Sequence, residues 1–259
     1  MKNNCRKKER YKFLFPNLSK NYKTFTYHID RIASEIVDEL DEYVISFSGG
    51  IDCTLILASL LKNGADPKKI MCIHVDLSKR NRYYAFHKQI SKHIAEKTGV
   101  KLVVVPPSKT GRIIESAIEF FGFSTFLHGD GLDRMYCKSY KKDYETGIHF
   151  SHGERFRTRH PYIDYLTATL PHMILVHGKH VDSVDTDYIS RRFDDFEADN
   201  NCRMIRYGKD KQLAHFMYKI SNSTNFYSWF FWKSFNKWYV EDSLGVSHHN
   251  LCREAMKTN

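Results

Sequence analysis

The sequence predicts an α/β fold, with a doubly wound parallel sheet of four to five strands followed by a C-terminal helical region. Short β-rich runs alternate with amphipathic helical runs through about residue 131. Such alternation implies parallel strands with helices on both faces of the sheet. Two glycine-rich turns, at residues 48–54 and 128–133, each follow one of the β-rich runs. Ligands bind such sheets at the carboxyl ends of the strands, so these turns are the first candidates for a functional site.

The individual elements follow from the period of the apolar residues. Isoleucine and leucine recur at spacings of three and four over residues 27–41, which predicts an amphipathic helix. Runs rich in β-branched residues predict strands at residues 43–47, 70–75, 101–106 and 124–131. The helices expected between them cover residues 56–63, 82–99 and 112–121, and the first two end at Gly64 and Gly99. The aromatic-rich segment 218–240 predicts a helix that either packs on the sheet domain or stacks a substrate base.

The length and composition suit one domain of ordinary size with a substantial appendage. The chain has 259 residues, and 42% of them are hydrophobic, which is enough for a core. We expect a basic N-terminal arm at residues 1–25 and an α/β domain at residues 26–140. A mainly helical C-terminal region at residues 141–259 is expected to complete the substrate site.

The formal net charge of +10 favours anionic partners, without choosing between nucleotides, nucleic acids and acidic surfaces. Much of the excess lies in the N-terminal arm, where basic residues outnumber the single acidic residue Glu9. The basic residues of the arm are Lys2, Arg6, Lys7, Lys8, Arg10, Lys12, Lys20 and Lys23. Two interpretations stay open: the arm binds a nucleic acid, or it is a solvated tail.

The cysteine and histidine patterns predict no metal site. The six cysteines form no CxxC pair, and the histidines crowded between residues 149 and 180 match no known ligand spacing. No apolar signal segment is present, so we expect reduced thiols and a cytoplasmic protein. No run approaches the roughly 18 apolar residues of a membrane span, so no membrane partner is expected.

The segment SFSGGIDCT, at residues 46–54, has the features of a phosphate-binding loop. Two glycines let the backbone approach a ligand, and the following helix directs its N-terminal dipole to the same point. Ser48 and Thr54 add hydroxyl groups. Asp52 adds a carboxylate that repels phosphate unless a cation lies between them, which predicts Mg²⁺. No lysine follows the glycines, so the GxxxxGK[ST] loop of phosphoryl-transfer enzymes is excluded.

This segment resembles the SGGxDS signature of the PP-loop ATP pyrophosphatases, with Cys53 in place of the second serine. The resemblance implies an adenine nucleotide alpha hydrolase-like fold and cleavage of ATP between the α- and β-phosphates. It implies that an acyl- or imidoyl-adenylate forms, from which an amine or sulfur nucleophile displaces AMP. A thiol donates a weaker hydrogen bond than a hydroxyl, so Cys53 reduces the grip on pyrophosphate unless Thr54 compensates. The implied ATP-binding residues here are Phe47, Ser48, Gly49, Gly50, Asp52, Cys53, Thr54 and Val75.

A second segment, LHGDGLDRMY at residues 127–136, resembles the SGEGADE segment of asparagine synthetases and related amide-forming enzymes. The resemblance implies that its first acidic residue lies near the adenylate and that its later aspartate helps to hold magnesium pyrophosphate. It adds His128 and Gly129 to the ATP-binding residues. The implied catalytic residues are Asp52, Asp130 and Asp133, of which Asp52 and Asp133 bind Mg²⁺.

Together these resemblances imply an ATP-dependent, AMP-forming ligase that forms a carbon–nitrogen bond. It is asparagine-synthetase-like without a glutaminase domain. It adenylates a carboxylate or amide oxygen of a small molecule and transfers the activated group to an amine. ATP and Mg²⁺ are the implied cofactors. Because the sheet domain is expected to begin by about residue 40, we expect ammonia or another amine as the donor.

Two alternatives stay open. The basic arm favours a PP-loop enzyme that modifies a nucleic acid, tRNA-lysidine-synthetase-like or phosphoadenylylsulfate-reductase-like. Cys53, and Arg134 where the family has glutamate, favour a non-catalytic nucleotide-binding module. The stretch RHPYID at residues 159–164 resembles the RxPFLD stretch of asparagine synthetases, and Lys209 and Lys211 are candidates for a contact with pyrophosphate.

Overall fold

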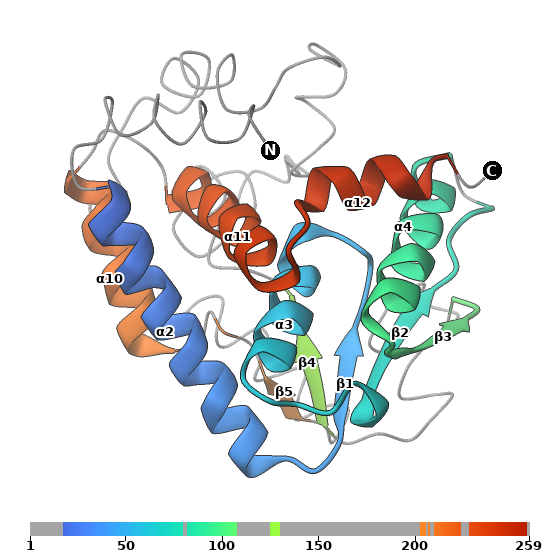
Figure 1. Ribbon diagram of the computed structural model, residues 1–259, viewed down its shortest axis with the longest axis horizontal. Coiled ribbons are helices and arrows are strands. Elements are labelled where there is room, and N and C mark those ends of the chain that lie inside the picture. Colours follow the sequence, from blue (N-terminus) through green and yellow to red (C-terminus); the bar gives the residue numbers. More distant parts are fainter. Residues whose placement is uncertain are drawn as a thin grey trace, which may run out of the picture.

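The computed structural model describes residues 18–79, 82–107, 125–129, 203–205, 207, 210–223 and 228–257. Within these ranges the protein has a mixed α/β fold on a sheet of strand order β3-β2-β1-β4-β5 (Figure 1). The strands are β1 Tyr43–Ser46, β2 Ile70–Val75, β3 Lys101–Val105, β4 Thr125–His128 and β5 Arg203–Ile205. Each hydrogen-bonded pair in this order is parallel. The prediction of a mixed α/β fold with a parallel sheet is confirmed.

The strand order reverses at β1. From β1 the chain passes outward to β2 and then β3, and it returns on the other side of β1 as β4. Ile45 pairs with Leu127 and Ser46 with His128 across this second junction, and Ile45 and Leu127 are fully buried. The strand that follows β1 in the described chain, β2, lies on one side of this junction and β5 lies on the other, and doubly wound and related α/β sheets bind ligands at such a point.

Helices α3 (Ile51–Lys62) and α4 (Arg82–Thr98) lie on the same face of the sheet (Figure 1). The units β1–α3–β2 and β2–α4–β3 step in one direction, and right-handed crossovers in one direction place their helices on one face. A doubly wound sheet also needs helices on the opposite face. The helix predicted at residues 112–121, between β3 and β4, lies outside the described residues, so the doubly wound arrangement stays a prediction.

Helices α2 (Leu18–Glu39), α11 (Ser228–Leu244) and α12 (His248–Ala255) cover α3 and α4, and α10 (Lys211–Ser223) packs on α2 and α11. A 3₁₀ helix, η1 (Pro67–Lys69), precedes β2. α11 packs against α3, α12 against α4, and α10 beside α2 (Figure 1). None of the helices in the described ranges is long and apolar enough to cross a membrane.

Helix α2 begins earlier than the apolar spacing predicts. It starts at Leu18, and Phe25 and Ile29 on it are fully buried. The last part of the expected basic arm therefore belongs to a packed helix. The rest of the arm, residues 1–17, lies outside the described residues.

The aromatic-rich segment 218–240 falls in two helices, the end of α10 and most of α11. Phe235 and Tyr239 of α11 are buried in the core, and the ring centroid of Phe235 lies 5.2 Å from that of Phe25. These contacts agree with the packing interpretation of the segment. Strand β5 also comes from the region predicted to be mainly helical.

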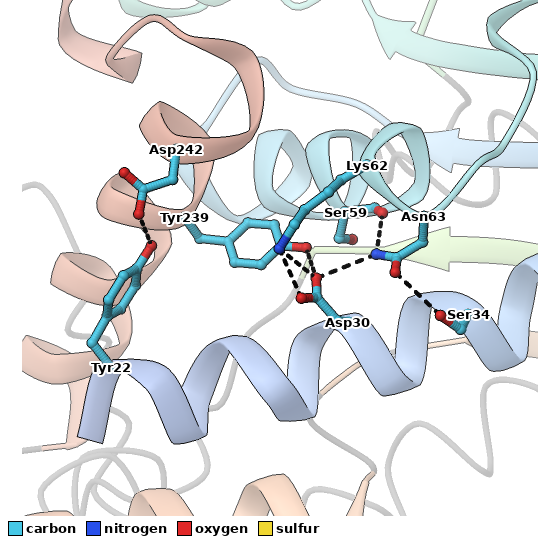
Figure 2. A network of polar contacts seen from close by, with 8 residues as sticks. All are labelled: Tyr22, Asp30, Ser34, Ser59, Lys62, Asn63, Tyr239 and Asp242. Carbon is cyan, nitrogen blue, oxygen red and sulfur yellow. Dashed lines mark hydrogen bonds and ion pairs between the residues drawn. The ribbon is translucent and has the colours of Figure 1, made fainter. Parts of the chain in front are cut away.

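Asp30 of α2 joins three helices through its carboxylate (Figure 2). Lys62 Nζ donates to the two carboxylate oxygens at 2.7 and 3.0 Å, and Asn63 Nδ2 donates at 3.3 Å. The Tyr239 hydroxyl of α11 donates to the same carboxylate, and Lys62 Nζ lies 4.7 Å from the centroid of the Tyr239 ring. We call these four residues the Asp30 network. It fastens α11 to α2 and to the C-terminal end of α3.

Candidate functional site

The loop between β1 and α3 turns at Gly49, whose φ of +73° lies in the left-handed region that favours glycine. A Cβ at this position would also lie 2.9 Å from the backbone nitrogen of Ser91 on α4, so the loop approaches α4 more closely than a side chain permits. Gly50 is the N-cap of α3, and its carbonyl oxygen accepts from the N–H and the hydroxyl of Thr54 at 3.0 and 2.8 Å. The first N–H groups of α3 lack partners within the helix, so this helix end favours an anion.

The second glycine-rich turn begins directly against the first turn of α3. A Cβ on Gly129 would lie 2.7 Å from the nitrogen of Cys53 and 3.1 Å from the carbonyl carbon of Asp52, distances that only glycine tolerates. Gly129, the described part of the second turn together with the backbone of His128, therefore meets the first turn of α3 at the carboxyl ends of β1 and β4, where the strand order reverses. Of the second turn's predicted residues, Asp130 and Asp133 lie outside the described residues.

Three histidines bind three consecutive carbonyl groups of the first loop. His74 Nδ1 lies 3.0 Å from the oxygen of Phe47, His87 Nδ1 lies 2.9 Å from that of Ser48, and His248 Nε2 lies 2.9 Å from that of Gly49. The histidines come from three separate elements, β2, α4 and α12. A carbonyl oxygen only accepts hydrogen bonds, so each of these ring nitrogens carries a proton.

Asp52, in the first turn of α3, is bound by two side chains of α11. Lys233 Nζ donates to one carboxylate oxygen, and Asn236 Nδ2 donates to the other at 2.9 Å. The side chains of Asp52 and Lys233 keep 22% and 19% of their exposure, so solvent reaches the pair. The site thus combines one carboxylate and one ammonium group with the amide groups of a glycine loop, a set that suits a metal-bound polyphosphate.

Cys53 lies buried beneath the loop and donates to the Gly50 oxygen, with its Sγ 3.1 Å away. Burial raises the pKa of its thiol, and hydrogen bonds from the Ser48 hydroxyl and from the N–H groups of Ser48 and Gly49 oppose that rise. Thr54 is fully buried, and its hydroxyl also donates to Gly50. Both side chains therefore brace the loop, and their predicted contacts with ATP stay predictions.

The other predicted site residues are placed less directly. Phe47 and Val75 are buried at the ends of β1 and β2, and their proximity to adenine stays a prediction. Of His128, only the backbone is described, as the last residue of β4. No three His, Cys, Asp or Glu side chains in the described part of the chain are grouped to hold a metal ion. The predicted pairing of Asp52 with Asp133 around Mg²⁺ is therefore untested.

Burial keeps two of the loop-binding histidines, His74 and His248, in the neutral form. It lowers the pKa of His248 to about 4, the hydrogen bond to Gly49 opposes this shift, and Lys237 adds to it. Burial also lowers the pKa of His74. Both rings are therefore neutral near pH 7, and each donates its single ring proton to the loop.

Sequence reasoning missed Lys233, Asn236 and the three histidines. A signal for the first two exists: they are polar residues three apart within the aromatic run WFFWKSFNKWY, where a helix turns both toward one face. For the histidines the sequence holds no comparable sign, because they lie on three separate elements.

Lys209 lies outside the described residues, and nothing is described of the Lys211 side chain beyond its place at the start of α10.

Comparison of the chain with protein-family models, with curated proteins and with solved structures finds no match.

Proposed function

We propose that this protein binds ATP at the loop of residues 48–54 and adenylates a carboxylate or amide oxygen of a small-molecule substrate, releasing pyrophosphate. The observation that carries the proposal is the contact of Gly129 with the first turn of α3, which joins the two glycine-rich turns at the strand-order reversal. A polyphosphate at this point meets the loop amides, the N-terminus of α3 and the ammonium group of Lys233.

The arrangement favours attack on the α-phosphorus over transfer of the terminal phosphoryl group. The loop lacks the lysine of phosphoryl-transfer loops, and its cationic side chain comes instead from α11, beside Asp52. In the proposed reaction the substrate oxygen bonds to the α-phosphorus while the bond from that phosphorus to the bridging oxygen of the β-phosphate breaks. The electron pair leaves with pyrophosphate, and the loop amides and Lys233 stabilise its charge.

Magnesium fits the donor chemistry of this proposal in part. Asp52 is a carboxylate beside the anion-binding loop, and carboxylate and phosphate oxygens are the ligands that Mg²⁺ prefers. Asp133 is the proposed second carboxylate. When bound, the ion would neutralise charge on the pyrophosphate leaving group. In the structure Asp52 already binds Lys233 and Asn236, which hold its two oxygens in place.

An amine is the proposed second substrate, in an asparagine-synthetase-like reaction. Its nitrogen attacks the activated carbon of the adenylate, AMP leaves, and the nitrogen loses a proton. The sulfur-transfer alternative gains no support from Cys53, because the thiol is buried and its raised pKa keeps it protonated. Asp130 is proposed to lie near the adenylate.

The test is a pyrophosphate-exchange screen. Purified protein, ATP, Mg²⁺ and radiolabelled pyrophosphate are incubated with a panel of carboxylic acids and amides, with ammonium as the amine source in turnover assays. We expect label to enter ATP with at least one acid, and AMP and pyrophosphate to be the primary products. ADP and orthophosphate as primary products would contradict the proposal.

Two variants connect that activity to the site. Lys233→Ala should reduce exchange at least tenfold, because it removes the ammonium group that lies beside Asp52 in the first turn of α3. Lys92→Ala is the matched control, since Lys92 is a lysine of α4 whose side chain is 72% exposed and forms an ion pair with Glu96. Equal losses in both variants would place the catalytic charge elsewhere.

A further inference from the structure

The carbonyl groups of Phe47, Ser48 and Gly49 all bind histidines, and this fixes the direction of the loop amides. In a trans peptide the C=O and the N–H of the next residue point in opposite directions. No peptide bond in the described ranges is cis. Each N–H that follows a bound carbonyl, those of Ser48, Gly49 and Gly50, therefore points away from the histidine concerned.

These N–H groups point toward the N-terminal turn of α3 and toward the loop's own side chains. The N–H groups of Ser48 and Gly49 face the sulfur of Cys53, which lies in the first turn of α3, and the N–H of Gly50 lies 3.2 Å from Ser48 Oγ. A peptide flip at any of these positions would replace a donor by a carbonyl oxygen, which repels an anion.

A glycine loop needs such restraint. Glycine populates positive and negative φ with similar ease, so the peptides on either side of Gly49 have few steric barriers to rotation. The side chains of Cys53 and Thr54 bind the carbonyl of Gly50, whereas the three carbonyls before it are bound by histidines from outside the loop. Two of the three carbonyls are bound by residues of β2 and α4, and the third by His248 from α12, 199 positions further along the chain.

The surroundings of His248 keep a proton on Nε2, the nitrogen that donates to the Gly49 carbonyl. Its Nε2 donates to Gly49, and its other nitrogen, Nδ1, lies 3.7 Å from the sulfur of Cys252, one turn along α12. Burial raises the pKa of Cys252 to about 11, so the thiol keeps its proton and can donate it to Nδ1. This contact selects the tautomer with the proton on Nε2.

We propose that His74, His87 and His248 form a histidine clamp, a set of positioning residues that holds the loop backbone with its amides on the side of the N-terminus of α3, where the β- and γ-phosphates of ATP are proposed to bind. The proposal rests on the proposed function, because it assigns the amides to a polyphosphate. The clamp does not touch the ligand; it acts through the backbone of residues 47–49.

Matched amide substitutions test the clamp. The side-chain nitrogen of glutamine reaches the position of histidine Nε2, and that of asparagine reaches the position of Nδ1. Because His248 donates from Nε2 and His87 from Nδ1, the same two replacements should have opposite outcomes at the two positions. His248→Gln and His87→Asn should bind inorganic pyrophosphate within about threefold of wild type, whereas His248→Asn and His87→Gln should bind at least tenfold more weakly, the loss expected for one hydrogen bond.

Affinity is measured by titration calorimetry with magnesium pyrophosphate, and folding of each variant is checked by thermal denaturation. Wild-type protein that binds no pyrophosphate would contradict the proposed function itself. Wild-type binding together with equal losses for glutamine and asparagine at each position would overturn the clamp alone. If a variant fails to fold, Cys252→Ala gives a milder test, with weaker pyrophosphate binding expected and unchanged binding counting against the clamp.

Discussion

A polar cluster lies at each end of helix α3, and in each cluster one carboxylate accepts hydrogen bonds from a lysine and an asparagine. At the N-terminal end Asp52 accepts from a lysine and an asparagine, Lys233 and Asn236 of α11. At the C-terminal end Asp30 accepts from Lys62 and Asn63 (Figure 2). Both carboxylates keep part of their exposure, 22% for Asp52 and 31% for Asp30.

The clusters differ in what surrounds them. Asp30 also accepts from the buried Tyr239, and its neighbours are helical side chains of α2, α3 and α11. Asp52 has the glycine loop, the Gly129 turn and the first N–H groups of α3 beside it. A carboxylate with lysine and asparagine is therefore no sign of function by itself. We assign the Asp52 cluster to chemistry because it lies at the carboxyl ends of the strands, and the Asp30 cluster to helix packing because it does not.

The sharpest test of this contrast is Asp52→Asn. We expect the adenylation step to fall by roughly 10²-fold or more, because the charge acts mainly on the transition state, with little change in stability. Pyrophosphate exchange with the substrate found in the screen measures the first effect, and urea denaturation the second. Wild-type turnover in this variant would remove Asp52 from the mechanism.

At the other end of α3, Asp30→Ala should show the reverse. It leaves the buried Tyr239 hydroxyl without its acceptor, so we expect the free energy of unfolding to fall by about 2 kcal/mol. ATP affinity of the folded protein, measured by calorimetry below the unfolding transition, should stay within about threefold of wild type. Lost affinity with unchanged stability would mean that the two clusters cannot be separated.

The smallest effect is expected at Cys53→Ser. A hydroxyl can donate to Gly50 as the thiol does, and serine is the residue of the family signature that this segment resembles. We expect unchanged or faster turnover. Complete loss of activity in a folded variant would mean that the thiol has its own chemical role, and sulfur transfer would then be favoured over amide formation.

The sequence predicts best those elements that a short local pattern determines. Strand β2 has the predicted bounds, and β1, β3 and β4 begin within one residue of theirs, because short β-branched runs between glycine and polar turns determine them. α2 begins nine residues before the predicted start at residue 27 because its apolar period continues backward through Phe25 and Tyr22 among polar residues. β5 has only three residues, Arg203–Ile205, too few for a period.

The candidate site likewise has a local part that the sequence predicts and a distant part that it does not. The loop residues Ser48 to Thr54 are contiguous, so their spacing alone indicates an anion-binding turn. Lys233 and the three histidines reach it only through tertiary packing, from β2, α4, α11 and α12. The sequence predicts the backbone of the proposed ligand site, while the side chains that hold this backbone depend on contacts between distant segments.

The large sequence separation of these contacts has a consequence for folding during synthesis. The loop leaves the ribosome early, whereas Lys233 follows Asp52 by 181 residues and His248 follows Gly49 by 199. Contacts of such high sequence separation form late and slow folding. A nascent chain that ends before α11 lacks the partners of Asp52 and of the Gly49 carbonyl, so full nucleotide binding should begin only when α11 and α12 have been synthesised.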